Sequence, residues 1–171
     1  WIGEVVGVAK AYTTRVGAGP FPTEADAEPA ALICDRGAEF GATTGRPRRC
    51  GWLDMVALRY SLALSGIERL IITKHDLLAS LPSIPVCVGY KLDGKELSTF
   101  PREVETLMRV TPVYEELAGW ETDTSGARTE AELPEKARAY LKRIEELSGA
   151  RVAVASVGAA SYAIVEFERL L

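Results

Sequence analysis

Arginine and threonine side chains cluster in residues 41–49, which read Gly-Ala-Thr-Thr-Gly-Arg-Pro-Arg-Arg. Pro47 is incompatible with an ordinary helix interior, so this stretch is predicted to be a loop. Guanidinium groups donate paired, charge-assisted hydrogen bonds to carboxylate or phosphate, and threonine hydroxyls add neutral donors. Gly45 allows the backbone to approach a ligand closely. The cluster therefore has the chemistry of a binding site for small anions.

The same cluster has two plainer explanations, which are a solvated basic surface and a contact to nucleic acid. The chain carries 20 Lys and Arg residues against 24 Asp and Glu residues, whereas a dedicated nucleic-acid-binding domain is usually strongly basic. The basic character is thus local to the loop. We therefore expect no nucleic-acid partner and rank that alternative last.

A second candidate site follows an apolar run, where residues 73–76 read Thr-Lys-His-Asp. The carboxylate of Asp76 can accept two parallel hydrogen bonds from N1 and N2 of guanine, whereas adenine presents an acceptor and no amine at that edge. The aliphatic stem and ammonium group of Lys74 can cover the plane of the base. The alternative is a surface ion pair at the end of a strand, and that explanation would be preferred if the motif stood alone.

The only histidine of the chain, His75, lies between these two residues. Alternate side chains of an extended segment face opposite sides, so His75 is expected to point away from Lys74 and Asp76, as a structural or solvent-facing residue. The three cysteines contain no Cys-x-x-Cys pair and have no histidine cluster near them. This pattern supports neither a zinc site nor a disulfide framework, so no metal ligand is predicted.

The elements that must position these loops alternate between strands and helices, which predicts an α/β fold. Short apolar runs predict strands at residues 5–12, 70–73, 85–91 and 151–155. The strand at 5–12 is expected to be buried on both faces, as in a parallel sheet. Helical periodicity and end signals predict helices at residues 28–36, 55–65 and 134–148, with Asp54 as the N-cap of the second.

Three further segments complete the predicted organisation. Asp93-Gly94 predicts a tight hairpin turn, because this dipeptide suits positive backbone angles. Residues 100–120 are interrupted by proline and are predicted to be irregular. Residues 162–167 are expected to pair or pack at the edge of the sheet.

The composition fits a single globular domain. A chain of 171 residues with 47% hydrophobic and 26% charged residues is long enough to bury a core. No apolar run in it approaches the length of a membrane span, and no charged-then-apolar leader is recognisable. The expected setting is cytoplasmic, with no membrane partner.

Taken with residues 11–24, 51–54 and 156–158, the two candidate sites resemble the C-terminal part of adenylosuccinate synthetase, the GTP-dependent ligase that joins IMP to aspartate. The resemblance runs in the same order through nearly all of the 171 residues. It implies a mostly parallel central sheet with flanking helices and a P-loop-NTPase-like architecture, of which residues 1–171 form the C-terminal portion of one domain. The chain departs from the family pattern at Pro47, which is usually basic or variable, and at Ala159, which is usually proline.

The resemblance also implies ligands for each loop. The IMP-binding residues would be Val16, Gly17 and Arg46; the aspartate-binding residues would be Thr43, Thr44, Gly45, Arg46 and Arg48; the GTP-binding residues would be Arg48, Lys74, His75, Asp76, Ser156, Val157 and Gly158. The loops that carry these residues are expected to fold into one pocket for a purine nucleotide and a small diacid. A homodimer is expected from the family alone.

The chain begins at Trp1 and contains no Gly-x-x-x-x-Gly-Lys-Ser/Thr phosphate-binding loop, so we expect it to be a fragment. The family resemblance assigns the catalytic residues and the Mg²⁺ ligands to the N-terminal portion, so no catalytic residue is predicted here. The isolated polypeptide is accordingly predicted not to turn over. The alternative is a catalytically inactive nucleotide-binding or interaction fragment.

Overall fold

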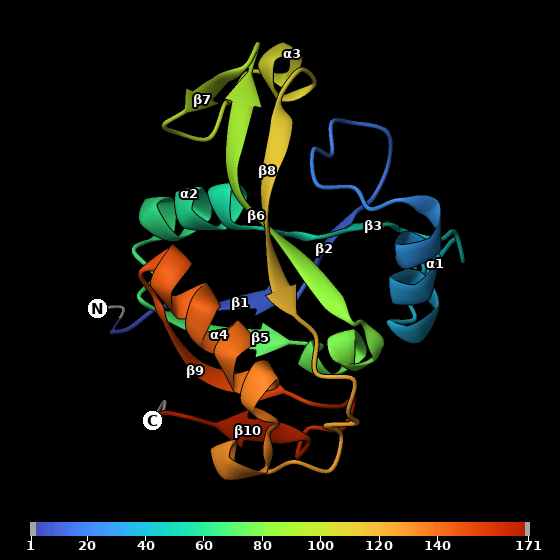
Figure 1. The fold of residues 1–171 in the computed structure, drawn as a ribbon, viewed down its shortest axis with the longest axis vertical. Coiled ribbons are helices and arrows are strands. Elements are labelled where there is room, and N and C mark those ends of the chain that lie inside the picture. Colours follow the sequence, from blue (N-terminus) through green and yellow to red (C-terminus); the bar gives the residue numbers. More distant parts are fainter. Residues whose placement is uncertain (1–2, 170–171) are drawn as a thin grey trace. The chain divides into compact units, whose positions relative to one another are not determined.

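The computed structural model describes residues 3–169, which fold into two compact units (Figure 1). One unit contains the segment up to Ala11, Leu58–Ile84, and the segment from Leu117 onward, and we call it the sheet unit. The other contains Tyr12–Ala57 and Pro85–Glu116, and we call it the loop unit. The chain passes between the units after Ala11 and again within three elements: helix α2 (Met55–Ser65), strand β6 (Ser83–Leu92) and strand β8 (Thr111–Ala118).

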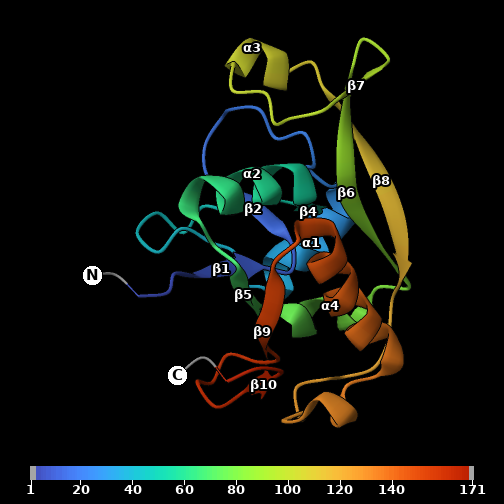
Figure 2. The ribbon, with the colours of Figure 1, turned by 90° about the vertical axis from the view of Figure 1, so that its left-hand side faces the viewer.

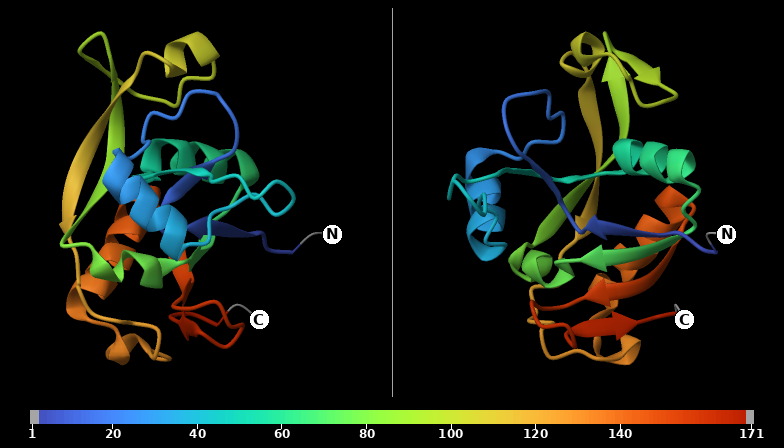
Figure 3. Two further views of the ribbon diagram at one scale, coloured as in Figure 1. Left: turned by 90° about the vertical axis from the view of Figure 1, so that its right-hand side faces the viewer. Right: turned by 180° about the vertical axis from the view of Figure 1, so that it is seen from behind.

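A four-stranded sheet forms the centre of the sheet unit, in the order β1-β5-β9-β10 (Figures 1 and 3). Its strands are β1 (Val6–Lys10), β5 (Arg69–Thr73), β9 (Arg151–Ser156) and β10 (Ile164–Glu166). The first three strands are parallel, and β10 runs antiparallel to β9. The predicted mostly parallel sheet and the predicted edge position of the last apolar segment are confirmed.

Strand β1 corrects one prediction, because it is not buried on both faces. It lies at the end of the strand order, and the side chain of Val8 is 69% exposed. On the alternate face, a Cβ at position 7 would lie 3.0 Å from side-chain carbons of Ile67 and Leu70, so only glycine fits against them without displacement. An apolar run indicates a strand but carries no information about which strand occupies the edge, and this is why the prediction failed.

Helix α4 (Glu135–Ser148) packs against β9, as Figure 2 shows. Its buried face consists of side chains at helical spacing: Ala137, Tyr140, Leu141 and Ile144. The hydroxyl of Tyr140 donates a hydrogen bond of 2.7 Å to the carbonyl of Ala11. Gly149 follows the helix with φ of 74°, the left-handed conformation that commonly ends helices. Two short 3₁₀ helices, η1 (His75–Ser80) and η2 (Glu130–Glu132), complete this unit.

The loop unit contains a two-stranded ribbon and a small mixed sheet. The ribbon pairs β2 (Thr13–Arg15) with β3 (Arg49–Gly51) in antiparallel fashion, and helix α1 (Ala27–Arg36) packs against β3. The mixed sheet contains β4 (Leu53–Asp54), β6, β7 (Lys95–Leu97) and β8, with helix α3 (Val104–Leu107) between the last two in sequence. Asp93 and Gly94 have φ of 51° and 81°, which confirms the predicted turn between β6 and β7.

Residues 100–120 were predicted to be irregular, and this was wrong. They contain α3 and the eight-residue strand β8, which pairs with β6. Pro112 is only the second residue of the strand, a position near the strand start where a missing N–H is tolerated. From Val113 to Ala118 the side chains alternate between half-buried and exposed, and this period of two was the signal that the proline obscured.

Asp54 links the start of α2 to the core of the loop unit. Its Oδ1 atom accepts hydrogen bonds of 3.0 Å from the amides of Val56 and Ala57, which confirms the predicted N-cap. Its Oδ2 atom accepts a short hydrogen bond from the buried hydroxyl of Tyr90. Burial and the Asp54 carboxylate both raise the pKa of Tyr90. The ring of Tyr90 packs with Cys87 and Val56, so one carboxylate joins helix, strand and core.

The three cysteines, Cys34, Cys50 and Cys87, are buried free thiols. Within residues 3–169 no helix has the length and apolar character required to traverse a lipid bilayer.

Replacing the fully buried Ile144 with alanine should lower the free energy of unfolding of the chain by about 2–4 kcal/mol, because the truncation leaves a cavity between α4 and the sheet. Chemical denaturation monitored by circular dichroism measures this change. Lys142→Ala on the exposed side of the same helix is the matched control, for which we expect a change below about 0.5 kcal/mol. Equal effects of the two substitutions would contradict the placement of α4.

Candidate functional site

The basic loop of residues 41–49 turns tightly in the loop unit. The amide of Gly45 donates to the carbonyl of Gly41, and the amide of Gly41 donates to the carbonyl of Arg46, both at 2.8 Å. Gly45 has φ of 63°, a conformation that residues with a side chain rarely adopt. Residues 42–47 are exposed, and the Thr44 hydroxyl accepts a weak hydrogen bond from the Arg46 amide at 3.4 Å. Thr43, Thr44, Gly45 and Arg46 thus form the exposed tip of one turn.

The three arginines of this loop have different surroundings. Arg46 is exposed and makes no ion pair with any described residue. Arg48 is half-buried, and its Nη1 atom lies 2.9 Å from Oε2 of Glu39. Glu39 is fully buried and also accepts a hydrogen bond of 2.7 Å from the Tyr12 hydroxyl. Sequence reasoning did not identify Glu39 as part of this site, although it lies only two residues before the loop.

The β2–β3 ribbon brings the loop of Val16 and Gly17 to the same end as the arginine loop. Arg15, the last residue of β2, lies opposite Arg49, the first residue of β3. The segment that leaves β2 and the segment that enters β3 therefore emerge side by side. Val16 is 78% exposed, and Gly17 has a positive φ of 78°. The ribbon thus gathers the residues assigned to IMP and to aspartate at one end.

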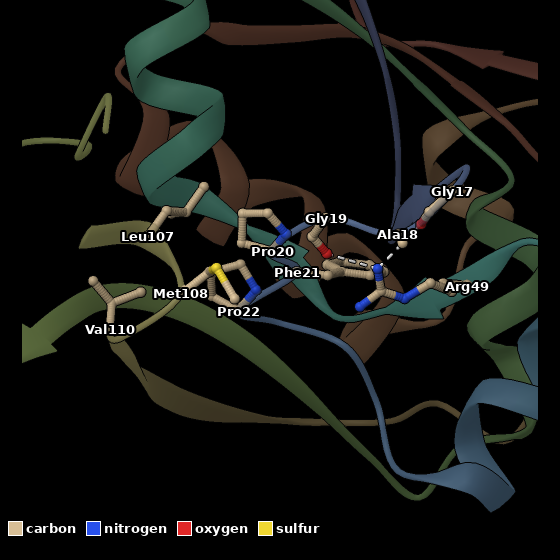
Figure 4. Close-up of a pocket in the computed structure, with 10 residues that line it drawn as sticks. All are labelled: Gly17, Ala18, Gly19, Pro20, Phe21, Pro22, Arg49, Leu107, Met108 and Val110. Atoms are coloured by element: carbon tan, nitrogen blue, oxygen red, sulfur yellow. Dashed lines mark hydrogen bonds between the residues drawn. The ribbon is translucent and has the colours of Figure 1, made fainter. Parts of the chain in front are cut away.

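A pocket of about 750 Å³ adjoins this end of the ribbon (Figure 4). It is lined by Gly17, Ala18, Gly19, Pro20, Phe21, Pro22, Arg49, Leu107, Met108 and Val110. Most of these side chains are apolar, and Met108 is strongly exposed. The walls of the pocket are therefore suited to an apolar surface, whereas the charged and hydroxyl groups predicted to bind anions lie on the neighbouring arginine loop.

In the sheet unit, the predicted guanine-binding residues meet at the ends of two adjacent parallel strands. Lys74 follows β5 with φ of 59°, and its amide donates a hydrogen bond of 3.0 Å to the Ser156 hydroxyl at the end of β9. The amide of Val157 donates to the carbonyl of Ala163 at 2.9 Å, which closes the next turn. Ligand sites in open α/β sheets gather at such carboxyl ends. The structure therefore brings residues 74–76 and 156–158 together.

Asp76 is only partly buried, and burial raises the pKa of its carboxyl group, although the nearby Lys74 ammonium lowers it. Asp123 also faces this carboxyl group and raises its pKa through charge repulsion. A hydrogen-bond donor pair such as the guanine edge would favour the ionised carboxylate. The position is thus suited to bind two donors.

His75 is fully buried, so of the two expected possibilities it is a structural residue and not a solvent-facing one. Its ring stacks on Trp120 with centroids 4.5 Å apart and an interplanar angle of 20°. Residues 74–76 are not extended as predicted, because Lys74 is left-handed and His75 begins the 3₁₀ helix η1. Burial lowers the pKa of His75 to about 4, so the ring is neutral at physiological pH. Any contact of His75 with a nucleotide is restricted to its backbone.

Within residues 3–169 there is no group of three or more His, Cys, Asp or Glu side chains that could hold a metal ion.

Comparisons with known proteins agree on one family. Residues 1–165 match the family model of adenylosuccinate synthetase. The chain is 53% identical over 157 residues to adenylosuccinate synthetase from Heliobacterium modesticaldum, and 53% identical over 153 residues to the protein of the same name from Clostridium perfringens. These alignments cover 92% and 90% of the chain.

The fold is similar to a solved structure described as fully ligated adenylosuccinate synthetase from Plasmodium falciparum. The TM-score is 0.94 at 37% sequence identity, and the match covers 98% of this chain and 40% of that one. The chain spans only 37% of the length of its Heliobacterium relative and 36% of its Clostridium relative.

The buried His75 should make the stability of the chain depend on pH. Its pKa is about 4 in the folded chain and near 6.5 when unfolded, so the unfolded chain binds more protons between these values. The stability contributed by the neutral ring is complete above pH 6.5 and is lost as the pH falls toward 4. His75→Phe keeps an aromatic ring that can stack on Trp120 but removes the titration.

Urea denaturation at pH 7 and pH 5 measures the effect. We expect the unfolding free energy of the wild-type chain to fall by about 2 kcal/mol more than that of His75→Phe between these two values. Because the chain has no other histidine, every remaining titratable group is shared by the two proteins. Equal pH dependence in both would contradict a buried, neutral His75.

Proposed function

Since the chain belongs to the adenylosuccinate synthetase family, we propose that it supplies the substrate-binding loops of a GTP-dependent ligase that joins IMP and L-aspartate. The product would be adenylosuccinate, with GDP and phosphate released, a step in purine biosynthesis. The observation that carries the proposal is the hydrogen bond from the Lys74 amide to the Ser156 hydroxyl. This bond joins the two strand-end turns that the proposal assigns to GTP.

The sheet unit would bind the guanine base. The carboxylate of Asp76 accepts hydrogen bonds from N1 and N2 of guanine, and the stem of Lys74 covers one face of the ring. The turn formed by Ser156, Val157 and Gly158 contributes backbone groups next to Lys74. The Cβ of a residue at position 158 would come within 3.0 Å of the Ala163 Cβ, so glycine keeps this turn close to its neighbour.

The loop unit would bind the aspartate substrate at the exposed turn of residues 43–48. The hydroxyl of Thr44 and the guanidinium groups of Arg46 and Arg48 provide donors for two carboxylates. Arg46 lacks an ion-pair partner among the described residues, so its charge is available to a ligand. In the proposal Arg48 also reaches GTP and Arg46 also reaches IMP.

The backbone of Val16 and Gly17 would contact the ribose of IMP. Both residues follow β2, at the ribbon end where the arginine loop also emerges. The proposed IMP and aspartate contacts therefore come from one rigid ribbon. Placing a dicarboxylate beside a nucleotide in this way favours reaction through proximity and neutralisation of charge.

In the proposed reaction, the 6-oxygen of IMP attacks the γ-phosphorus of GTP, and the bond from that phosphorus to the bridging oxygen breaks to release GDP. The amine of aspartate then forms a bond to C6, loses a proton, and displaces phosphate. The residues of this chain bind and orient the reactants, and no described residue is assigned as acid, base or metal ligand. Mg²⁺ ligands and homodimer formation remain expectations from the family.

A chimera provides an activity assay. In it, the chain replaces the 157 matching residues of the Heliobacterium modesticaldum relative. We expect the chimera to form adenylosuccinate from IMP, aspartate and GTP, and the 171-residue chain alone to form none. The alternative, an inactive nucleotide-binding or interaction fragment, predicts that the chimera binds GTP but does not turn over. A strongly salt-dependent binding of DNA without a saturable GTP site would favour the nucleic-acid alternative.

Asp76→Asn in the chimera should raise the KM for GTP by about 10- to 100-fold, because the amide group would place a donor against the N–H groups of guanine. The same variant should accept xanthosine triphosphate better than the parent does, since the amide can donate to the 2-oxo group. Steady-state kinetics with both nucleotides measure the change. Asp93→Asn, on an exposed turn of the loop unit, is the charge-matched control. An unchanged preference for GTP would remove Asp76 from the base site.

Arg46→Leu in the chimera should raise the KM for aspartate by about tenfold or more while changing the KM for GTP by less than about threefold, because a charge-assisted bond to a carboxylate is lost. Arg102→Leu removes another exposed arginine of the loop unit and should leave both constants unchanged. If Arg46→Leu affected aspartate and GTP equally, the assignment of the loop would be wrong.

A further inference from the structure

The third arginine of the basic loop, Arg49, has a different environment from Arg46 and Arg48. Its side chain turns toward the segment that follows β2 (Figure 4). Nη1 donates to the carbonyls of Gly17 at 3.2 Å and Gly19 at 2.7 Å. The guanidinium group also lies 5.4 Å from the centroid of the Phe21 ring.

The opposite side of the same guanidinium group is held by Glu24. Nε donates to Oε1 at 2.7 Å and Nη2 donates to Oε2 at 2.5 Å, which is a bidentate pair. This pairing lowers the pKa of Glu24 and raises the pKa of Arg49. A guanidinium group has five N–H donors, and these contacts occupy four of them. Arg49 is therefore poorly placed to bind a dicarboxylate.

The segment of residues 16–23 is anchored on β3 at one end and on the residue that follows β3 at the other. At one end, the backbone of Arg15 in β2 lies opposite that of Arg49 in β3. At the other end, the amide of Trp52 donates a hydrogen bond of 2.9 Å to the carbonyl of Thr23. A Cβ at position 51 would lie 2.2 Å from the Thr23 carbonyl oxygen, so Gly51 permits this close approach. Between the two anchors, the Glu24 amide donates a hydrogen bond of 3.1 Å to the carbonyl of Phe21. The contacts of Arg49 hold the part nearest β2.

We propose that Arg49, paired with Glu24, is a positioning residue that fixes the backbone of residues 16–19. Its bonds to the carbonyls of Gly17 and Gly19 determine which way the peptide groups of this turn face. Because Gly17 has a positive φ and no side chain, nothing else in its own structure restricts that direction. The Arg49–Glu24 pair thus gives a flexible glycine turn one conformation.

For catalysis, this inference rests on the proposed function, in which Val16 and Gly17 meet the ribose of IMP. Arg49 would then affect the affinity for IMP without touching any substrate. Arg46 and Arg48, which the proposal assigns to aspartate, act by direct contact. The basic cluster would therefore contain two ligand-binding arginines and one arginine that shapes the neighbouring loop.

The conformational part is tested on the 171-residue chain by limited trypsin digestion, with cleavage after Arg15 followed by mass spectrometry. Arg49→Leu should accelerate this cleavage by about tenfold, because the loss of several charge-assisted bonds opens the turn. Glu24→Gln should give a smaller acceleration. Arg109→Leu is the matched control, since it removes an exposed arginine paired to Asp93 at 2.6 Å without loosening a glycine turn. Equal cleavage rates in Arg49→Leu and Arg109→Leu would overturn the proposal.

The catalytic part is tested in the chimera. We expect Arg49→Leu to raise the KM for IMP by about tenfold while the KM for aspartate changes less than about twofold, and Arg49→Lys to restore part of the affinity for IMP. If the KM for aspartate rose at least as much as that for IMP, Arg49 would be a substrate ligand and the inference would be wrong. A wild-type chimera without activity would refute the proposed function, whereas the trypsin rates would still decide the role of Arg49.

Discussion

The parallel pairing of β5 with β9 is the constraint on which the candidate nucleotide site depends. Ile72 lies opposite Ala155, so the two strands end at the same edge of the sheet. The Ser156 hydroxyl can then accept the amide hydrogen of Lys74, and the left-handed conformation of Lys74 directs the chain into η1. The position of Asp76 therefore follows from a ladder of backbone hydrogen bonds. The buried stack of His75 on Trp120 supports the same turn from the interior.

Local signals were sufficient for most elements. Proline before Glu135 and glycine after Ser148 delimit α4, and the Asp93-Gly94 dipeptide gave the β6–β7 turn. The two strand-end motifs were also identifiable, because polar residues directly follow apolar runs. These features depend on residues that are close to each other in the sequence, so the sequence alone is sufficient to predict them.

The features that the sequence did not predict depend on contacts between residues far apart in the chain. The exposure of Val8 depends on which strand ends the sheet, and the existence of β8 depends on pairing with β6. The role of Arg49 depends on carbonyls 30 and 32 residues earlier and on a carboxylate 25 residues earlier. In the sequence Arg49 is indistinguishable from Arg48, since both are arginines of one basic run. Only the fold shows that the Arg49 side chain contacts the turn of Gly17 and Gly19.

Acidic partners explain how three neighbouring arginines acquire different properties. Glu24 forms a bidentate pair with Arg49, and the buried Glu39 holds one nitrogen of Arg48, whereas Arg46 has no acidic partner among the described residues. Glu39 restricts the rotamers of Arg48 and offsets part of its charge, so a dicarboxylate bound as proposed would meet a better oriented but more weakly attracting donor. Arg46 keeps its full charge but must be ordered by the ligand. An anion that contacts both arginines therefore combines one prearranged donor with one adaptable donor, which reduces the entropy lost on binding while retaining a net positive site.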